Sequence, residues 1–315
     1  MTDSNANRPP RLPRREVHGV LLLDKPLGLS SNDALVRAKR LLRAAKAGHT
    51  GTLDPLATGL LPLCFGEATK FSQDLLEADK TYDAVVRLGA RSSTGDAEGE
   101  LLDVREVSCD RAAVEQALAS FLGEIEQVPP MHSALKKDGR PLYEYARAGQ
   151  TVERAARRVT IRSIALLDCA LPDAPSFTMR VTCSKGTYIR TLAEDIGEAL
   201  GCGAHLTGLR RIAVGDLTLD GAVTLEQIEQ HDDAQRPAML APVDALLQKC
   251  APVYLDEAAA ARFLQGQRIA QRDLPAGAGL AEDALARVYA GEPARLLGVA
   301  RMREGALRPE RLVKL

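Results

Sequence analysis

One stretch of the sequence combines tight backbone turns with a single acidic side chain: HTGTLDPLATG, residues 49–59. Asp54 precedes a proline, so its backbone is pushed towards an extended or turn geometry. Gly48, Gly51 and Gly59 permit a tight loop that another chain can approach closely. We expect this loop to lie between helical segments. Its carboxylate could form an ordinary Asx-turn with backbone amides, or it could carry out chemistry, and the loop alone does not decide between the two.

Three distant segments place further polar side chains at the ends of predicted strands. The run VLLLDKP at residues 20–26 reads as a buried strand that leads into a loop and a capped helix. The run KTYDAVVRLG at residues 80–89 alternates so that Tyr82 points inward from a strand. The run SKGTYIR at residues 184–190 is a strand end that turns into a helix. Arg190 then lies in the first helical turn, where the helix dipole disfavours a cation and an acidic partner best explains it.

These segments, together with GAH at residues 203–205 and LRR at residues 209–211, resemble the TruB family, the bacterial tRNA pseudouridine synthases that act on the T-loop. The resemblance extends from about Val17 to the C-terminus. It implies that Asp54 is the nucleophile that attacks the target uridine and that Arg190 pairs with its carboxylate and holds it ionised. It also implies that Tyr82 stacks on the target base and is a candidate for the proton transfers. The substrate-binding set that it implies is His49, Tyr82, Tyr188, Leu209 and Lys25, the last within a Lys25-Pro26 motif that supports the floor of the site.

The chemistry of this isomerisation suits these residue types. The bond from C1′ to N1 breaks, the base rotates, and a bond from C1′ to C5 forms, so neither a cofactor nor a metal is expected. A carboxylate can attack either C1′ or C6 as a nucleophile. Burial opposes its charged form and a nearby guanidinium favours it, a role that fits Arg190 beside Asp54.

A uridine inside a folded T-loop is not accessible, so the enzyme must extrude it from the loop. The phenol ring of Tyr82 can stack on an extruded base, a contact worth about 1–3 kcal/mol. Side chains must then occupy the vacated space in the RNA. His49, the first residue of the segment 49–59 and close to Asp54 in the sequence, is expected to help hold the RNA open, although a loop histidine with a local hydrogen bond is the alternative interpretation.

The distribution of charged residues along the sequence bears on whether RNA is a partner. The chain has 41 basic and 42 acidic residues, so its net charge does not reveal an RNA partner. Residues 1–50, however, hold ten Lys or Arg and four Asp or Glu, and residues 132–162 hold eight and three. Residues 92–128 hold two and nine. This segregation suits one side that faces the phosphates of tRNA and an opposite solvated side.

The remaining composition excludes several classes of protein. None of the 6 cysteines has the paired spacing of a metal site, and Cys202 with His205 provides too few ligands for zinc. We expect reduced thiols in a cytoplasmic protein. No stretch approaches the roughly 18 apolar residues of a membrane span, and the N-terminus lacks a signal core. Neither a membrane nor an obligatory protein partner is expected, and the protein is predicted to be a monomer.

Periodicity favours an α+β fold with a mixed, largely antiparallel central sheet flanked by helices, followed by a small C-terminal β-rich domain of the PUA type that the resemblance implies. We divide the chain into a flexible basic tail (1–16), a catalytic domain (17–250) and a PUA-like RNA-binding domain (251–315). An RNA-gripping insertion is expected at about 124–152, where a plain surface helix over 141–148 is the alternative. Predicted helices are 31–46, 110–122, 187–200, 224–230 and 255–265, and predicted strands are 80–88, 158–168, 176–184, 286–289, 296–302 and 307–313.

Three other functions compete with the tRNA-modifying enzyme. A non-catalytic RNA-binding or tRNA-folding module would not need Asp54, Tyr82 and Arg190, and all three are present. A glycosidase usually needs two catalytic acids at a set separation, and the sequence strongly marks one. A guide-RNA-dependent enzyme that acts on ribosomal RNA is the nearest rival.

Overall fold

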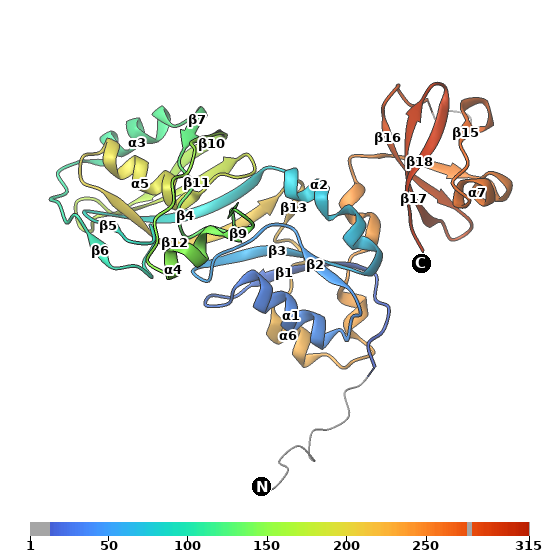
Figure 1. The fold of residues 1–315 in the computed structure, drawn as a ribbon, viewed down its shortest axis with the longest axis horizontal. Coiled ribbons are helices and arrows are strands. Elements are labelled where there is room, and N and C mark those ends of the chain that lie inside the picture. Colours follow the sequence, from blue (N-terminus) through green and yellow to red (C-terminus); the bar gives the residue numbers. More distant parts are fainter. Residues whose placement is uncertain (1–12, 276–278, 315) are drawn as a thin grey trace, which may run out of the picture.

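The computed structural model describes residues 13–275 and 279–314, which form two large β-sheets and two small two-stranded sheets with associated helices (Figure 1). In the larger sheet, β3 and β12 are parallel neighbours, and the other paired neighbours are antiparallel. The predicted α+β fold with a mixed, largely antiparallel central sheet is therefore confirmed. In spatial order its strands are β1 (Gly19–Lys25), β3 (Ala57–Phe65), β12 (Ala204–Val214), β4 (Lys80–Leu88), β11 (Ser176–Cys183), β10 (Arg157–Cys169) and β7 (Gly123–Gln127), with β2 (Ala47–His49) beside β3 and β13 (Leu217–Thr218) beside β12.

Strand β4 shows how alternation places side chains for the site. Lys80, Tyr82, Ala84, Val86 and Leu88 are buried on one face, and the residues between them are less buried. Because successive side chains of a strand point to opposite faces, the inward position of Tyr82 follows from the sequence. The prediction of a strand over 80–88 with Tyr82 on its buried face is confirmed.

Four helices cover one face of this sheet and share one hydrophobic core with it (Figure 1). Helix α1 begins after Ser30, whose Oγ accepts a hydrogen bond from the Asp33 amide at 3.1 Å. It ends at Leu41 and not at Lys46 as predicted, because Arg43 adopts a φ of 52° and the chain turns into β2. The four helices are α1 (Ser31–Leu41), α3 (Arg111–Ser120), α5 (Ile189–Ala199) and α6 (Leu225–Gln230).

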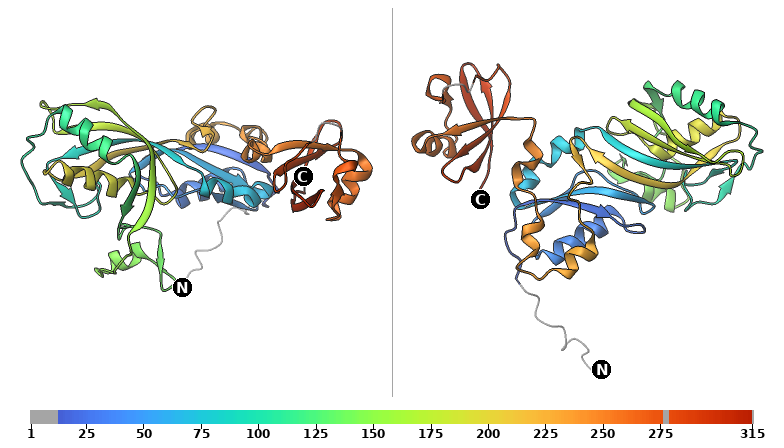
Figure 2. Two further views of the ribbon diagram at one scale, coloured as in Figure 1. Left: turned by 90° about the horizontal axis from the view of Figure 1, so that it is seen from above. Right: turned by 180° about the vertical axis from the view of Figure 1, so that it is seen from behind.

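Several short strands and helices complete the part of the chain that contains the larger sheet, which we call the first unit. The hairpin β8–β9 and helix α4 project from the central sheet within the predicted RNA-gripping insertion (Figure 2, left). Helix α4 coincides with the surface helix predicted over 141–148. These short elements are β5 (Arg91–Ser92), β6 (Leu101–Leu102), β8 (Lys136–Lys137), β9 (Arg140–Pro141), α2 (Ser72–Glu77) and α4 (Leu142–Arg147), with 3-10 helices η1 (Gly66–Phe71), η2 (Arg236–Met239) and η3 (Val243–Leu247).

The C-terminal residues form a second sheet with its own core around Phe263. Three of its five strands coincide with the three predicted there, the other two were not predicted, and helix α7 covers most of the predicted helix. A further cluster joins the two units, because Val20 and Phe71 pack with Tyr289 and Val299. In spatial order the strands are β14 (Ala251–Leu255), β16 (Leu285–Ala290), β17 (Arg295–Arg303), β18 (Ala306–Leu312) and β15 (Ile269–Ala270), with α7 (Glu257–Leu264) and η4 (Gln271–Asp273).

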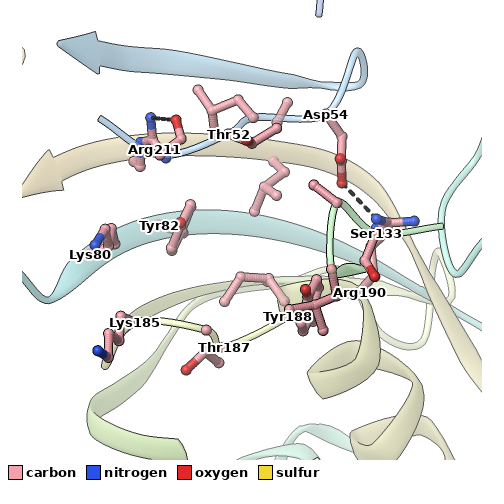
Figure 3. Close-up of a pocket in the computed structure, with 18 of the residues that line it drawn as sticks. Thr52, Asp54, Lys80, Tyr82, Ser133, Lys185, Thr187, Tyr188, Arg190 and Arg211 are labelled. Carbon is pink, nitrogen blue, oxygen red and sulfur yellow. Dashed lines mark hydrogen bonds and ion pairs between the residues drawn. The ribbon is translucent and has the colours of Figure 1, made fainter. Parts of the chain in front are cut away.

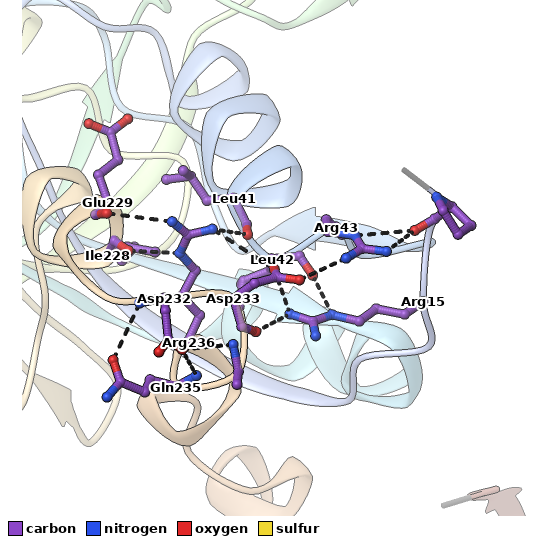
Figure 4. Close-up of polar contacts among 12 residues, drawn as sticks. Arg15, Leu41, Leu42, Arg43, Ile228, Glu229, Asp232, Asp233, Gln235 and Arg236 are labelled. Carbon is purple, nitrogen blue, oxygen red and sulfur yellow. Dashed lines mark hydrogen bonds and ion pairs between the residues drawn. The ribbon is translucent and has the colours of Figure 1, made fainter. Parts of the chain in front are cut away.

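The start of the described chain is fastened to the segment that follows α6 (Figure 4). Arg15 donates to the Leu42 carbonyl at 3.1 Å and to Asp233 Oδ1 at 3.1 Å. Arg43 donates to Asp233 Oδ2 at 2.7 Å, so one carboxylate connects both arginines. Of the predicted basic tail, residues 1–12 lie outside the described residues, and Arg15 is held in place.

Candidate active site

The loop that carries Asp54 connects β2 to β3, so the expectation that it lies between helical segments was wrong. Several bonds fix it from both sides. The Leu53 amide donates to Ser31 Oγ at 2.7 Å, and the Gly28 amide donates to the Pro55 carbonyl at 2.9 Å. These contacts connect the loop to the start of α1 and to the segment after β1. The loop is therefore a pre-formed support for the Asp54 side chain.

The partner of the Asp54 carboxylate is Arg190 (Figure 3). Arg190 Nη2 lies 2.8 Å from Asp54 Oδ2, and Nη1 lies 3.6 Å from Asp96 Oδ2. The same guanidinium donates to the carbonyl oxygens of Thr94 at 2.8 Å and His132 at 2.7 Å. The two carboxylates offset the unfavourable position of a cation at the N-terminus of α5. The side chain of Asp54 thus pairs with Arg190, as the resemblance implies.

Burial and charge act in opposite directions on Asp54. Burial raises the pKa of its carboxyl above the ordinary value, and the Arg190 guanidinium opposes this rise. Asp96 adds to the rise, whereas Lys25 and the hydrogen bond from Arg190 oppose it. Burial prevails in the free protein, although the Asp54 side chain retains 41% of its exposure to solvent. Arg190 therefore limits the rise in pKa but does not hold the pKa at or below its ordinary value.

Two cavities meet at Asp54. The first, of about 440 Å³, contains three of the predicted residues besides Asp54 and Arg190, namely Tyr82, Tyr188 and Leu209. The second, of about 520 Å³, is lined by His49 and by Tyr143 of the insertion. Asp54 and Arg190 line both cavities. Residues from β2, β4, α5 and β12, remote in sequence, are thereby brought around one carboxylate.

Tyr82 and Tyr188 contribute the aromatic walls of the first cavity (Figure 3). Burial raises the pKa of both hydroxyl groups, and the nearby Arg211 opposes the rise for Tyr82. The Tyr188 backbone is fixed where α5 begins, because its amide donates to Gln127 Oε1 at 3.0 Å. Both hydroxyl groups are neutral at physiological pH on this account.

His49 and Lys25 differ in their position relative to the two cavities, because His49 lines the second cavity and Lys25 lies outside both. Burial lowers the pKa of His49, so its ring is neutral at pH 7, and its Nδ1 is buried with no hydrogen-bond partner among the described residues. Lys25 is fully buried and lines neither cavity. Its Nζ donates to the carbonyl oxygens of Pro26 at 2.9 Å and Leu29 at 2.5 Å, and burial lowers its pKa to about 8. Lys25 thus fixes the backbone of the segment after β1, and the substrate contact predicted for it is not apparent from its position outside both cavity walls.

Sequence reasoning did not single out several residues that line these cavities. Lys80 lies two residues before Tyr82 on the same face of β4, so the alternation could have identified it. Arg211 likewise lies two residues after Leu209 on β12. Asp96 and Ser133 belong to irregular segments, and no local pattern indicates that they reach Arg190 and Tyr188.

Within residues 13–275 and 279–314, no group of three or more His, Cys, Asp or Glu is arranged to hold a metal ion. In the same described ranges, none of the helices is long and apolar enough to span a membrane.

Comparison with known proteins gives matches along most of the chain. Residues 39–189 match the family model of the TruB family pseudouridylate synthase N-terminal domain. Residues 190–248 match that of the tRNA pseudouridylate synthase B C-terminal domain, and residues 251–313 match that of pseudouridine synthase II TruB, C-terminal.

Individual relatives cover the whole chain. The tRNA pseudouridine synthase B of Cupriavidus taiwanensis is 93% identical over 315 residues and 100% of both chains, and that of Burkholderia mallei is 69% identical over 304 residues and 96% of both. A chain in the crystal structure of a Cbf5–Nop10–Gar1 complex has 25% identity and a TM-score of 0.68, covering 98% of this chain and 92% of that one. The family models and the relatives agree, and this chain belongs to the tRNA pseudouridine synthase B family.

Proposed function

We propose that this protein isomerises uridine to pseudouridine at position 55 in the T-loop of tRNA, with Asp54 as the nucleophile and without a cofactor. The observation that carries the proposal is the Asp54–Arg190 pair at 2.8 Å, set where two cavities meet. The relatives named tRNA pseudouridine synthase B support the same reaction and substrate.

The first cavity receives the extruded uridine in this proposal. Its volume of about 440 Å³ is sufficient for one nucleoside, and the ring of Tyr82 provides a stacking surface. Asp54 attacks either C1′ of the ribose or C6 of the base, and Arg190 orients its carboxylate. After the C1′–C5 bond forms, C5 loses a proton, for which Tyr82 is the candidate acceptor. Tyr188 and Leu209 pack around the base and fix its orientation.

The second cavity holds the RNA from which the uridine has been removed. His49 lines this cavity, and in this proposal its ring occupies the space vacated by the flipped base. Arg147 lies over the Tyr143 ring at 5.4 Å, and both residues line this cavity. The basic insertion at about 124–152 thereby contacts the T-loop beside the flipped nucleotide.

The domain division follows from these roles. Residues 17–250 bear the catalytic site, and residues 251–315 form a second, PUA-like domain that contacts tRNA. The enzyme acts as a monomer and needs no guide RNA or protein partner. The tRNA-folding module and the guide-dependent enzyme for ribosomal RNA are the alternatives, and the retained Asp54, Tyr82 and Arg190 disfavour the first.

The test uses a tRNA transcript labelled with tritium at C5 of its uridines and the purified protein without added cofactor. We expect tritium release by the wild type, none by Asp54→Asn, and none from a matched transcript with cytidine at position 55. Release from the cytidine transcript would refute the assignment of position 55. A well-folded wild-type protein that releases no tritium from either transcript would refute the proposed activity.

A further inference from the structure

The first cavity has two cationic ends whose partners differ (Figure 3). At one end, Arg190 is paired with Asp54 and with Asp96. At the other end are Arg211 and Lys80, which are 1% and 7% exposed. Among the described residues, no carboxylate lies within 4.0 Å of either of these two cations. Buried charges in proteins are usually paired, so this second end calls for an explanation.

The hydrogen bonds of these two cations go to neutral groups. Arg211 donates to the carbonyl oxygens of Leu60 at 2.8 Å and Gly51 at 3.3 Å. Lys80 donates to the carbonyl oxygens of Leu75 at 3.1 Å, Leu76 at 2.7 Å and Ala78 at 2.5 Å. Carbonyl oxygens satisfy the donors, but they do not balance two positive charges.

Nearby acids are already engaged elsewhere. Glu77 pairs with Lys185, and Asp79 accepts from Arg162 at 3.3 Å, both at the exposed surface. Arg162 and Lys185 therefore neutralise the acids nearest to Lys80. Both acids still act on Lys80 from a distance, but no described carboxylate is in direct contact with Lys80 or Arg211.

Arg211 also lies directly beside the predicted stacking surface. In the register of β12 against β4, Arg211 is opposite Tyr82, and both side chains line the first cavity. Directly opposite residues of an antiparallel pair have Cβ atoms about 4.5–5.5 Å apart. A base stacked on Tyr82 therefore lies within reach of the Arg211 guanidinium.

The reaction itself creates a negative charge at this place. Attack of Asp54 on C1′ forms a C–O bond and breaks the C1′–N1 bond, whose electron pair remains on the base and spreads to its oxygens. Attack on C6 instead forms a C–O bond there and moves the C5–C6 pair towards C5 and O4. In both cases the carboxylate charge is transferred to the uracil ring, away from Arg190.

We propose that Arg211 binds the uracil ring and stabilises the negative charge that develops on it, as the counterpart of Arg190 at the opposite end of the cavity. This role rests on the proposed function. Preorganised donors act most strongly where charge develops in the transition state. An uncompensated guanidinium suits that task, because its attraction is weak for the neutral uridine and strong for the anion.

The test compares Arg211→Met with Arg211→Lys in single-turnover reactions on tRNA bearing uridine or 5-fluorouridine at position 55. Fluorine withdraws electrons, so a 5-fluorouracil ring carries negative charge more easily and depends less on the enzyme. We expect Arg211→Met to slow the loss of uridine about 10²-fold, in line with removal of one such donor. Arg211→Lys keeps the charge and should lose less. On 5-fluorouridine the deficit of Arg211→Met should shrink at least tenfold, as measured by mass spectrometry of digested tRNA.

The matched control is Arg210→Met. Arg210 lies between two cavity residues on β12 but points to the other face, where it donates to Asp24 at 3.0 and 2.6 Å. It should keep wild-type rates on both substrates. Equal deficits of Arg211→Met on the two substrates would overturn the proposal, because a purely structural defect does not depend on the leaving base. An inactive wild type would instead contradict the proposed function. Thermal unfolding and tRNA binding by both Arg211 variants verify that each is folded, and Arg211→Lys keeps the test decisive if Arg211→Met does not fold.

Discussion

Replacement of Arg190 by lysine tests whether the planar guanidinium, and not only its charge, organises the site. The guanidinium contacts the Asp54 carboxylate and the carbonyl oxygens of Thr94 and His132 at 2.7–2.8 Å, and Asp96 at 3.6 Å. These partners belong to three separate segments of the chain. A lysine ammonium is a point donor and cannot reproduce the fork.

The size of the effect follows from the number of acceptors lost. If the ammonium reaches only one of the three close acceptors, two partly buried acceptors lose their donor. A fully buried unsatisfied group costs about 1–3 kcal/mol, and partial exposure reduces that cost, so Arg190→Lys should lower the free energy of unfolding by about 1–3 kcal/mol in total. The rate should fall by at least about 10²-fold, because a carboxylate displaced by about 1 Å no longer meets its target.

The assay combines urea unfolding, tritium release and tRNA binding. Binding should remain close to that of the wild type, since lysine keeps the positive charge at this position and Arg190 is only 6% exposed. Arg91→Lys is a suitable control: Arg91 lies 3.7–3.9 Å from the carboxylates of Asp103, Glu194 and Glu198 and is 42% exposed, so the substitution should change the free energy of unfolding by less than about 1 kcal/mol. Full activity of Arg190→Lys would refute the assignment of Arg190 as the group that orients Asp54.

Two further predictions concern stability. Gly59 has a φ of 95°, and a Cβ added there would lie 2.3 Å from the Arg211 carbonyl oxygen, so Gly59→Ala should cost about 2–5 kcal/mol from strain and overpacking. Gly221→Ala, at a φ of 72° with no atom within 4 Å of the added Cβ, should cost only the strain of about 1–2 kcal/mol, and equal losses in urea unfolding would contradict the steric account. Burial raises the folded-state pKa of Asp54 above its ordinary value of 3.8, so the folded protein binds the proton more tightly than the unfolded chain does. The stability of the wild type therefore falls as the pH rises from the unfolded-state pKa to the folded-state pKa. The non-titrating Asp54→Asn should therefore gain stability relative to the wild type as the pH rises above about 4, and a relative loss with rising pH would refute the raised pKa.

Local pattern was sufficient for much of the fold. The alternation over 80–88 predicted both β4 and the inward position of Tyr82. Helix α5 was predicted over 187–200 and runs from Ile189 to Ala199, because its apolar residues recur with helical spacing and Gly201 follows it. The helix predicted over 31–46 was too long, because Arg43 turns the chain at a φ of 52° and Ala44 forms a bridge with the distant Arg15, a contact that local pattern does not record.

The sequence by itself determined which chemical groups this protein can use. Asp54 before a proline in a tight loop, Tyr82 on a strand and Arg190 at a helix start are all visible in local patterns, and their joint resemblance to one family indicated the reaction. Only the tertiary structure decided what each group faces. Asp96 reaches Arg190 from a separate hairpin, burial raises the pKa of Asp54 despite that arginine, and Arg211 lies opposite Tyr82 with no carboxylate beside it in the described chain. Charge and burial depend on atoms brought together from distant segments, and spacing along the chain does not record those distances.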